Sequence, residues 1–160
     1  QEVVGEFGGV LLIDDFAHHP TPVRATLEAI RQRYPGRRLW AVFEPRSNTS
    51  RRRVFQADYA RALALADRVI VGGVLRKATD VLPEDEMFSP DQLVSDLKSL
   101  GLKARAFADP EVIALALQRN VRRGDVVVLL SNGDFGGLRS KLLRAWAPEP
   151  VGAAASRSRP

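Results

Sequence analysis

The sequence predicts an α/β domain with a single doubly wound, mostly parallel sheet and helices on both faces. Strand-like and helix-like segments alternate along almost the whole chain. The strand-like segments are apolar without strict alternation, which is typical of strands covered on both sides. At 160 residues the chain suits one domain, and 45% hydrophobic and 27% charged residues are ordinary values for a protein with a buried core.

The first elements are a hairpin and a helix. Residues 3–7 and 10–13 are β-prone and flank Gly8-Gly9, so we expect an antiparallel hairpin at the N-terminus. A helix follows Pro20-Thr21-Pro22 and ends at Pro35-Gly36. Its inner face is expected to contain four residues at helical spacing: Val23, Leu27, Ile30 and Tyr34.

Two more predicted strands, residues 39–43 and 68–71, flank a polar loop and a second helix. The inner face of that helix is expected to contain Phe55, Tyr59, Leu63 and Ala66. Residues 76–87 are polar and irregular. The run Ser89-Pro90-Asp91-Gln92 begins a third helix, because serine favours the N-cap, proline the first turn, and glutamine follows three residues on. We expect its inner face to contain Leu93, Leu97 and Leu100.

The C-terminal part continues the alternation with predicted strands at residues 104–107 and 126–130. Asp109-Pro110-Glu111 begins the helix between them, and a glycine-rich turn leads into a last helix. The inner faces of these two helices are expected to contain Ile113, Ala116, Leu117, Leu138, Leu142 and Trp146. We assign residues 1–147 to the domain and expect residues 148–160 to be a disordered tail.

The composition excludes several classes of protein. The chain has no cysteine, which excludes disulfides and thiolate metal sites, and its apolar runs are too short to cross a bilayer. Glu2 and Glu6 stand where a signal peptide would have a basic start and an apolar run, so we expect a cytoplasmic protein. The net charge of +5 is spread over several segments without a nucleic-acid-reading motif, so we expect neither nucleic acid nor a membrane as a partner.

Three polar loops follow predicted strands, at residues 14–21, 44–53 and 131–137. Ligands gather at the carboxyl ends of strands in an open α/β sheet, so these loops can form one site. In the first loop, Asp15, His18 and His19 are compatible with an acid–base pair or with a polar turn that caps the next helix. We predict no metal site, because no third ligand accompanies the two histidines.

The second loop is basic and the third is rich in glycine. Arg51, Arg52 and Arg53 stand where a helix begins, and each cation there opposes the helix dipole by about 0.3–1 kcal/mol. An anionic ligand would offset that cost, but a solvated basic face is the favoured interpretation. The glycines of residues 131–137 allow close approach to a ligand, although the loop is not a P-loop, since no Gly-Lys-Ser/Thr follows.

Three motifs bear on the family. They are Ile13-Asp14-Asp15-Phe16-Ala17-His18-His19-Pro20-Thr21, then Glu44-Pro45-Arg46-Ser47-Asn48-Thr49, then Ser131-Asn132-Gly133 with Phe135-Gly136-Gly137. Together they resemble the C-terminal domain of the Mur ligases, most closely the murein peptide ligases. UDP-N-acetylmuramate–L-alanine ligases share the first motif and are the alternative. A rival class is a non-catalytic nucleotide- or phosphate-binding module, because the fold alone supports both.

The resemblance implies one domain of a three-domain enzyme of peptidoglycan recycling or synthesis. In that enzyme ATP phosphorylates a carboxylate, and the amine of an acceptor attacks the acyl phosphate to form an amide. The cofactors implied for the whole enzyme are ATP and Mg, with none held tightly by this domain. The implied partners are the other two domains, UDP-N-acetylmuramate and a peptide or amino-acid acceptor. By itself this domain is expected to be inactive, with no catalytic residue.

The resemblance also assigns roles to residues. Asp15 matches the acid that contacts the ribose of the nucleotide, with His18 nearby. We expect the acceptor to be bound by His19, Arg46, Ser47, Asn48, Ser131, Asn132, Gly133 and Asp134. In this hypothesis Arg46 grips a carboxylate of the acceptor and Asp134 pairs with a cationic amine. The alternative is that Arg46 binds Glu44 and that Asp134 caps the last helix. Asp134, Arg139 and Ser50-Arg51 depart from the residues more usual in the family.

Overall fold

A computed structural model of the chain describes residues 2–47, 51–74, 83 and 86–146. Six strands form one sheet in the order β1-β2-β6-β3-β4-β5. The strands are β1 (Glu2–Phe7), β2 (Val10–Asp15), β3 (Leu39–Phe43), β4 (Arg68–Gly72), β5 (Lys103–Phe107) and β6 (Val126–Leu130). The strands β1 and β2 pair antiparallel, and the other neighbouring pairs are parallel, which confirms the predicted hairpin and the mostly parallel sheet.

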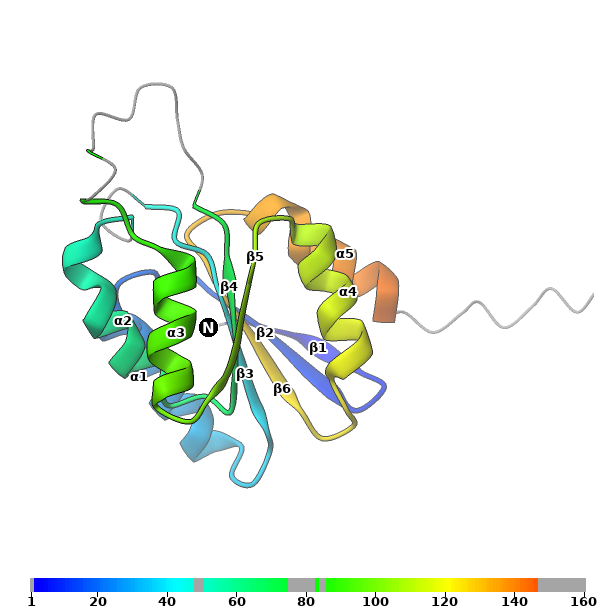
Figure 1. Cartoon of the computed structure of the whole chain (residues 1–160). Helices are drawn as coiled ribbons and strands as arrows, with labels where there is room; N and C mark the ends of the chain where they lie inside the picture. Colours follow the sequence, from blue (N-terminus) through cyan, green and yellow to red (C-terminus); the bar gives the residue numbers. More distant parts are fainter. Residues whose placement is uncertain (1, 48–50, 75–82, 84–85, 147–160) are drawn as a thin grey trace, which may run out of the picture.

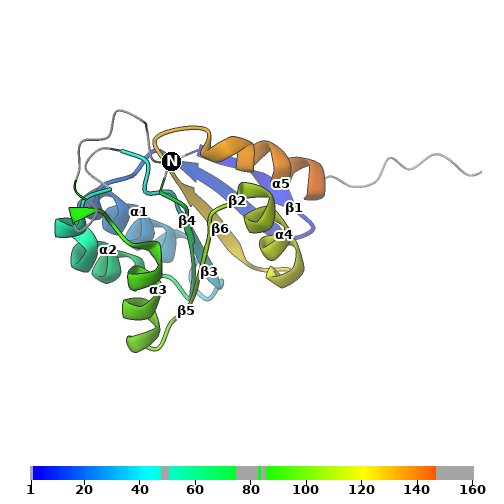
Figure 2. The same cartoon turned by 45° about the horizontal axis from the view of Figure 1, so that its top comes forward.

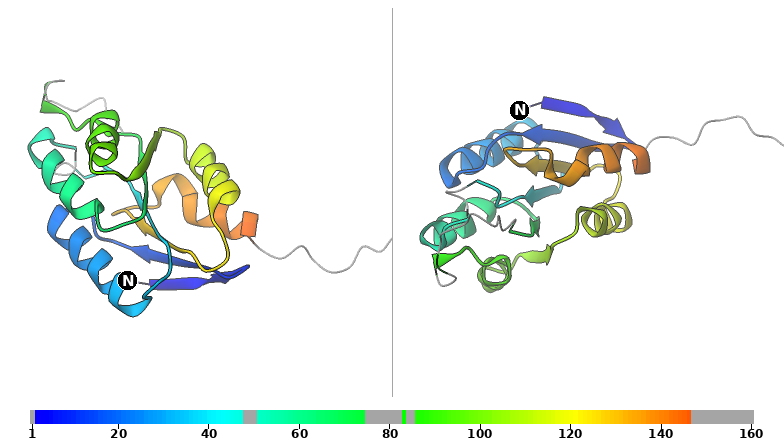
Figure 3. Two further views of the ribbon diagram at one scale, coloured as in Figure 1. Left: turned by 60° about the horizontal axis from the view of Figure 1, so that its bottom comes forward. Right: turned by 90° about the horizontal axis from the view of Figure 1, so that it is seen from above.

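Helices cover both faces of the sheet (Figure 1). The view from above in Figure 3 shows α1, α2 and α3 on one side of the strands and α4 and α5 on the other. Their bounds are α1 (Pro20–Arg33), α2 (Gln56–Leu63), α3 (Pro90–Ser99), α4 (Pro110–Asn120) and α5 (Leu138–Trp146). Short 3₁₀ turns, η1 (Arg53–Phe55) and η3 (Phe135–Gly137), precede α2 and α5.

Two apolar cores lie between the sheet and the helices, one on each face of the sheet. Successive residues of a strand point into alternate cores. In β6, Val126, Val128 and Leu130 pack with α1–α3, whereas Val127 and Leu129 pack with α4 and α5. All five residues of β3 and of β6 are buried. Each fully buried aliphatic side chain contributes about 1.5–3 kcal/mol relative to an exposed one, so these central strands hold the two layers together.

The predicted helix starts of α3 and α4 are confirmed by their capping bonds. Ser89 Oγ accepts from the backbone N–H of Gln92 at 3.1 Å, and Asp109 Oδ1 accepts from that of Glu111 at 2.8 Å. His19 occupies the N-cap position of α1, but its side chain makes no capping hydrogen bond. Capping of α1 by the His19 side chain therefore does not account for the histidine at this position.

Some predicted positions are wrong. Leu100 was expected on the inner face of α3, but the helix ends at Ser99 and Leu100 is 58% exposed. The helix α2 ends at Leu63, so Ala66 is buried in the turn that follows rather than on the helix. The predicted tail at residues 148–160 lies outside the described residues. Within the described ranges, no helix is long and apolar enough to cross a membrane.

The amino end of the sheet is held by one buried acid. Asp125, which is 3% exposed and precedes β6, accepts from Arg38 Nε at 3.0 Å and from Arg38 Nη2 at 2.6 Å. It also accepts from the indole Nε1 of Trp40 and from the backbone N–H of Arg122, both at 2.9 Å. These four bonds tie the start of β3 to the turn before β6.

Candidate functional site

The three polar loops leave the sheet at the same edge. Asp15 ends β2 and Phe43 ends β3, and both are in register with Leu130 at the end of the strand between them. Two backbone bonds continue the ladder into the loops, from Ser131 N to Asp15 O at 3.1 Å and from Glu44 N to Leu130 O at 3.0 Å. Figure 2, which brings the top of Figure 1 forward, shows the loops that follow β3 and β6 at this edge.

Glu44 lies in the middle of this edge and is 4% exposed. Ser131 Oγ donates a hydrogen bond to Glu44 Oε2. Burial raises the pKa of the Glu44 carboxyl, and the Ser131 bond and the Arg46 charge oppose that rise only in part. Sequence reasoning did not count Glu44 among the site residues. The signal was present, since an acid that directly follows five buried residues of β3 has little access to water.

Arg46 and the third loop form a compact unit. Arg46 Nη1 lies 3.1 Å from Asp134 Oδ1 and 3.9 Å from Glu44 Oε1. A Cβ atom added to Gly133 would lie 2.6 Å from the guanidinium carbon of Arg46, so a residue with a side chain would displace it. Glycine at position 133 therefore lets the guanidinium pack directly on the backbone of the loop.

The carboxylate of Asp134 contacts both Arg46 and the third loop itself. Besides its ion pair with Arg46, its carboxylate accepts from the backbone N–H of Gly136 at 3.2 Å and occupies the N-cap of η3. The alternative prediction was that Asp134 caps the last helix, but it caps η3, the turn that precedes α5. Arg46 is closer to Asp134 than to Glu44. Binding of an acceptor carboxylate by Arg46 stays a prediction, and it requires Arg46 to share or release Asp134.

Ser131 and Asn132 offer different hydrogen-bonding groups. Ser131 is 3% exposed, and its Oγ accepts from the backbone N–H of Gly133 at 3.0 Å while it donates to Glu44. The Oδ1 atom of Asn132 is buried, and within the described ranges no group donates a hydrogen bond to it. Ser131 therefore orders the loop, and Asn132 retains an acceptor. The predicted site residue Asn48 lies outside the described residues.

Asp15 ties the first loop to helix α1. It is 8% exposed, and its two oxygens accept from the backbone N–H of Ala17 at 2.7 Å and from Thr26 Oγ1 at 3.1 Å. These bonds hold the Asp15 carboxylate at the carboxyl end of β2, next to the loop that follows β6. The ribose contact of Asp15 stays a prediction.

The two histidines lie together beside an exposed aromatic ring. The ring centroids of His18 and His19 are 4.3 Å apart, and Phe16 meets His18 edge-on at 5.5 Å. His18 Nδ1 lies 2.9 Å from the carbonyl oxygen of Phe16. Phe16 is 67% exposed, and an apolar ring in a polar loop was a signal that sequence reasoning missed. In the described part of the chain, no three His, Asp or Glu side chains are grouped to hold a metal ion.

The interpretation of Arg51 as part of a solvated basic face is wrong, because Arg51 is 2% exposed. Its backbone N–H donates to Ser47 O at 3.1 Å, and its carbonyl accepts from Phe88 N at 2.8 Å. Arg52 and Arg53 are exposed, as expected. Arg51 thus anchors the second loop next to α3, an arrangement that depends on a contact with a residue distant in the sequence.

Comparisons with known proteins identify relatives that share these sequence motifs' family. Residues 1–133 match the family model described as "Mur ligase, glutamate ligase domain". A UDP-N-acetylmuramate–L-alanine ligase of Kineococcus radiotolerans is 40% identical over 91% of the chain and 30% of its own length. The UDP-N-acetylmuramate–L-alanyl-gamma-D-glutamyl-meso-2,6-diaminoheptandioate ligase of Escherichia coli is 36% identical over the same shares of the two chains.

A solved structure agrees as well. The crystal structure of a murein peptide ligase from Psychrobacter arcticus matches with a TM-score of 0.74 and 28% identity, over 91% of this chain and 29% of that one. The chain thus spans about a third of the length of its relatives. Since the family model covers residues 1–133, which include the first two loops and the start of the third, the chain belongs to the Mur ligase family.

Proposed function

We propose that this chain is the acceptor-side domain of an ATP-dependent ligase that forms an amide bond between UDP-N-acetylmuramate and an amino acid or peptide. The observation that carries the proposal is the convergence of three family motifs at the carboxyl ends of β2, β3 and β6. The names of the two relatives, from Kineococcus and Escherichia coli, support this class of reaction.

The preferred acceptor in this proposal is a peptide that carries several carboxylates. Glu44-Pro45-Arg46-Ser47 is the part of the sequence that favours murein peptide ligases, and Arg46 is a bidentate donor suited to a carboxylate. L-alanine is the second candidate, because the Kineococcus relative is named for that acceptor and has the higher identity of the two relatives.

The geometry gives each group a separate task in binding the acceptor. Arg46 is held over Gly133 at the rim of the edge, where it meets a carboxylate. The buried Oδ1 of Asn132 receives no hydrogen bond from the residues that the structure describes, and in this proposal it accepts from an N–H of the acceptor, either the nucleophilic amine or an amide. The buried hydrogen bond between Ser131 and Glu44 joins the second and third loops, so that these groups keep their positions when the acceptor binds.

The nucleotide is proposed to lie beside the first loop. Asp15 is a carboxylate of the type that accepts from ribose hydroxyls, and the half-buried His18 and the exposed Phe16 follow it in the same loop. ATP with Mg would supply the phosphoryl group that activates the carboxylate. We further propose that the enzyme works in the cytoplasm, with the two remaining domains supplying the UDP-sugar site and the P-loop.

The test uses a full-length protein that contains this domain, supplied with UDP-N-acetylmuramate, ATP and Mg. Either the tripeptide L-alanyl-γ-D-glutamyl-diaminopimelate or L-alanine is added, and the amide product is measured by mass spectrometry. We expect the product with the tripeptide at higher kcat/KM. The isolated chain should neither hydrolyse ATP nor ligate. ATP hydrolysis by the pure isolated chain, or no product with either acceptor, would contradict the proposal.

A further inference from the structure

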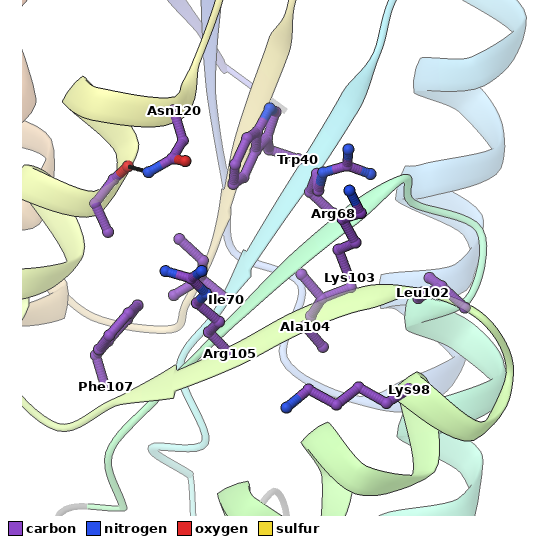
Figure 4. Close-up of a pocket in the computed structure, with 12 residues that line it drawn as sticks. Trp40, Arg68, Ile70, Lys98, Leu102, Lys103, Ala104, Arg105, Phe107 and Asn120 are labelled. Carbon is purple, nitrogen blue, oxygen red and sulfur yellow. Dashed lines mark hydrogen bonds between the residues drawn. The ribbon is translucent and has the colours of Figure 1, made fainter.

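A hollow of about 430 Å³ lies on the α4 side of the sheet, away from the candidate site. Its floor is formed by Trp40 of β3 and Ile70 of β4, which are 7% and 3% exposed. Asn120 of α4 lies on one side of the hollow and β5 on the other (Figure 4). Ala116 of α4 also lines it. Trp40 and Asn120 place it toward the amino ends of the strands, opposite the edge that carries the Mur ligase motifs.

Four basic side chains line this hollow, and none of its lining residues is acidic. They come from three places: the start of β4, the end of α3 and the edge strand β5 (Figure 4). The four residues are Arg68, Lys98, Lys103 and Arg105.

These cations have few partners within the protein. Arg68 Nη1 donates to the carbonyl oxygen of Asp67 at 2.9 Å, while the Asp67 carboxylate pairs with Arg31. For the other three, Lys98, Lys103 and Arg105, the part of the chain that the structure describes provides no ion pair or hydrogen bond to the side chain. Like charges around one hollow repel each other, so a bound anion would relieve the repulsion.

A purely structural role explains part of the cluster. Lysine and arginine on an exposed edge strand discourage pairing with another chain, and Lys103 and Arg105 stand on the edge strand of this sheet. That role does not require Arg68, which stands on the inner strand β4, or Lys98, which comes from α3. The convergence of all four on one hollow is the observation that protection of the edge leaves unexplained.

We propose that this hollow binds a small molecule with several linked phosphate groups, an oligophosphate. Its volume lies in the range of about 300–1,000 Å³ that is usual for small-molecule sites. Guanidinium groups bind phosphate oxygens in bidentate fashion, and lysines act as point charges, so the two types together suit a chain of phosphates. A protein partner is less well matched, because Trp40 and Ile70 are already buried and leave little apolar area to cover.

The test is a calorimetric titration of the 160-residue chain with inorganic tripolyphosphate at about 0.15 M ionic strength, where surface attraction is screened beyond ~8 Å. We expect one site. The double variant Lys103→Glu/Arg105→Glu should bind at least tenfold more weakly. The matched control is Arg33→Glu/Arg144→Glu, which has the same change in net charge at two exposed arginines outside the hollow. The control should change affinity by no more than about twofold.

Two further measurements make the outcome decisive. Citrate should bind at least tenfold more weakly than tripolyphosphate, and tripolyphosphate should shift the NMR amide signals of β5 and the end of α4. If the charge-reversed variant is unfolded by circular dichroism, Arg68→Ala replaces it. Equal weakening in the control, equal binding of citrate, no binding at millimolar concentration, or preferential binding of random DNA through Lys103 and Arg105 would each overturn the proposal. No group of the Mur ligase edge lines the hollow, so this result is independent of the proposed ligase function.

Discussion

Two buried acids stand at opposite ends of the sheet and differ in how they are satisfied. Asp125, at the amino end, is 3% exposed and accepts four hydrogen bonds, two of them from Arg38. Glu44, at the carboxyl end, is 4% exposed but accepts from the neutral hydroxyl of Ser131, and its Oε1 lies 3.9 Å from Arg46 Nη1.

This difference distinguishes the Asp125 cluster, which stabilises the fold, from the carboxyl edge of the sheet, which carries the candidate site. The hydrogen bond to Asp125 raises the pKa of the Arg38 guanidinium, so the charged form of Arg38 is favoured at this end of the sheet. For Glu44, burial raises the pKa, so the fold favours the neutral form. Groups that are incompletely satisfied within the protein gather where ligands bind, and the comparison therefore points to the carboxyl edge.

The largest expected effect is on stability, at the amino end. Asp125→Ala removes all four acceptor bonds and leaves Arg38 and the Trp40 indole N–H without their shared partner. We expect a loss of about 3–5 kcal/mol in the free energy of unfolding, measured by urea denaturation. Glu44→Gln is the matched control and should change it by less than about 1 kcal/mol. Equal losses in the two variants would remove the distinction between the two ends.

The next effect concerns the nucleotide. In the full-length enzyme, Asp15→Ala should raise the KM for ATP, because each lost hydrogen bond to a charged group contributes about 1.5–3 kcal/mol before water compensates. Thr26→Val is the control, since it removes one protein donor to Asp15 but keeps the carboxylate. If Asp15→Ala lowers stability and leaves ATP kinetics unchanged, Asp15 anchors the loop and does not contact the nucleotide.

The third effect concerns the acceptor. Arg46→Ala should lower the turnover of the full-length enzyme by about tenfold or more, because a misplaced acceptor loses its orientation toward the acyl phosphate. The KM for ATP should stay unchanged. Arg52→Ala, an exposed arginine near the same loop, should have little effect. If Arg46→Ala and Ser131→Ala change stability alone, these loops are scaffold and the acceptor binds elsewhere.

The contrast between the two ends also marks what the sequence can predict. Local patterns predicted the strands and the starts of α3 and α4, because capping and hydrophobic spacing act over a few residues. The placement of β6 between β2 and β3 requires the tertiary fold. So do the site contacts: Ser131 meets Glu44 across 87 positions, and Arg46 meets Asp134 across 88. The burial of Arg51 was missed for the same reason.

The smallest expected effect tests the protonation of Glu44. Its pKa is raised above the ordinary 4.5 by burial, so the folded state binds the proton more tightly than the unfolded state. Between pH 4.5 and the raised value, the folded protein therefore carries more bound protons, and stability falls as pH rises through that interval. The contribution of the neutral carboxyl is fully present below the unfolded pKa and is lost above the folded pKa.

Glu44→Gln isolates this effect because glutamine cannot ionise but its amide oxygen can still accept from Ser131. The measurement is the free energy of unfolding of both proteins from pH 4 to pH 8. Relative to Glu44→Gln, the wild type should become less stable as the pH rises through this interval and then reach a plateau. A difference that instead grows in favour of the wild type would mean that the ionised carboxylate is the stabilised form. The raised pKa of Glu44 would then not distinguish the carboxyl end of the sheet.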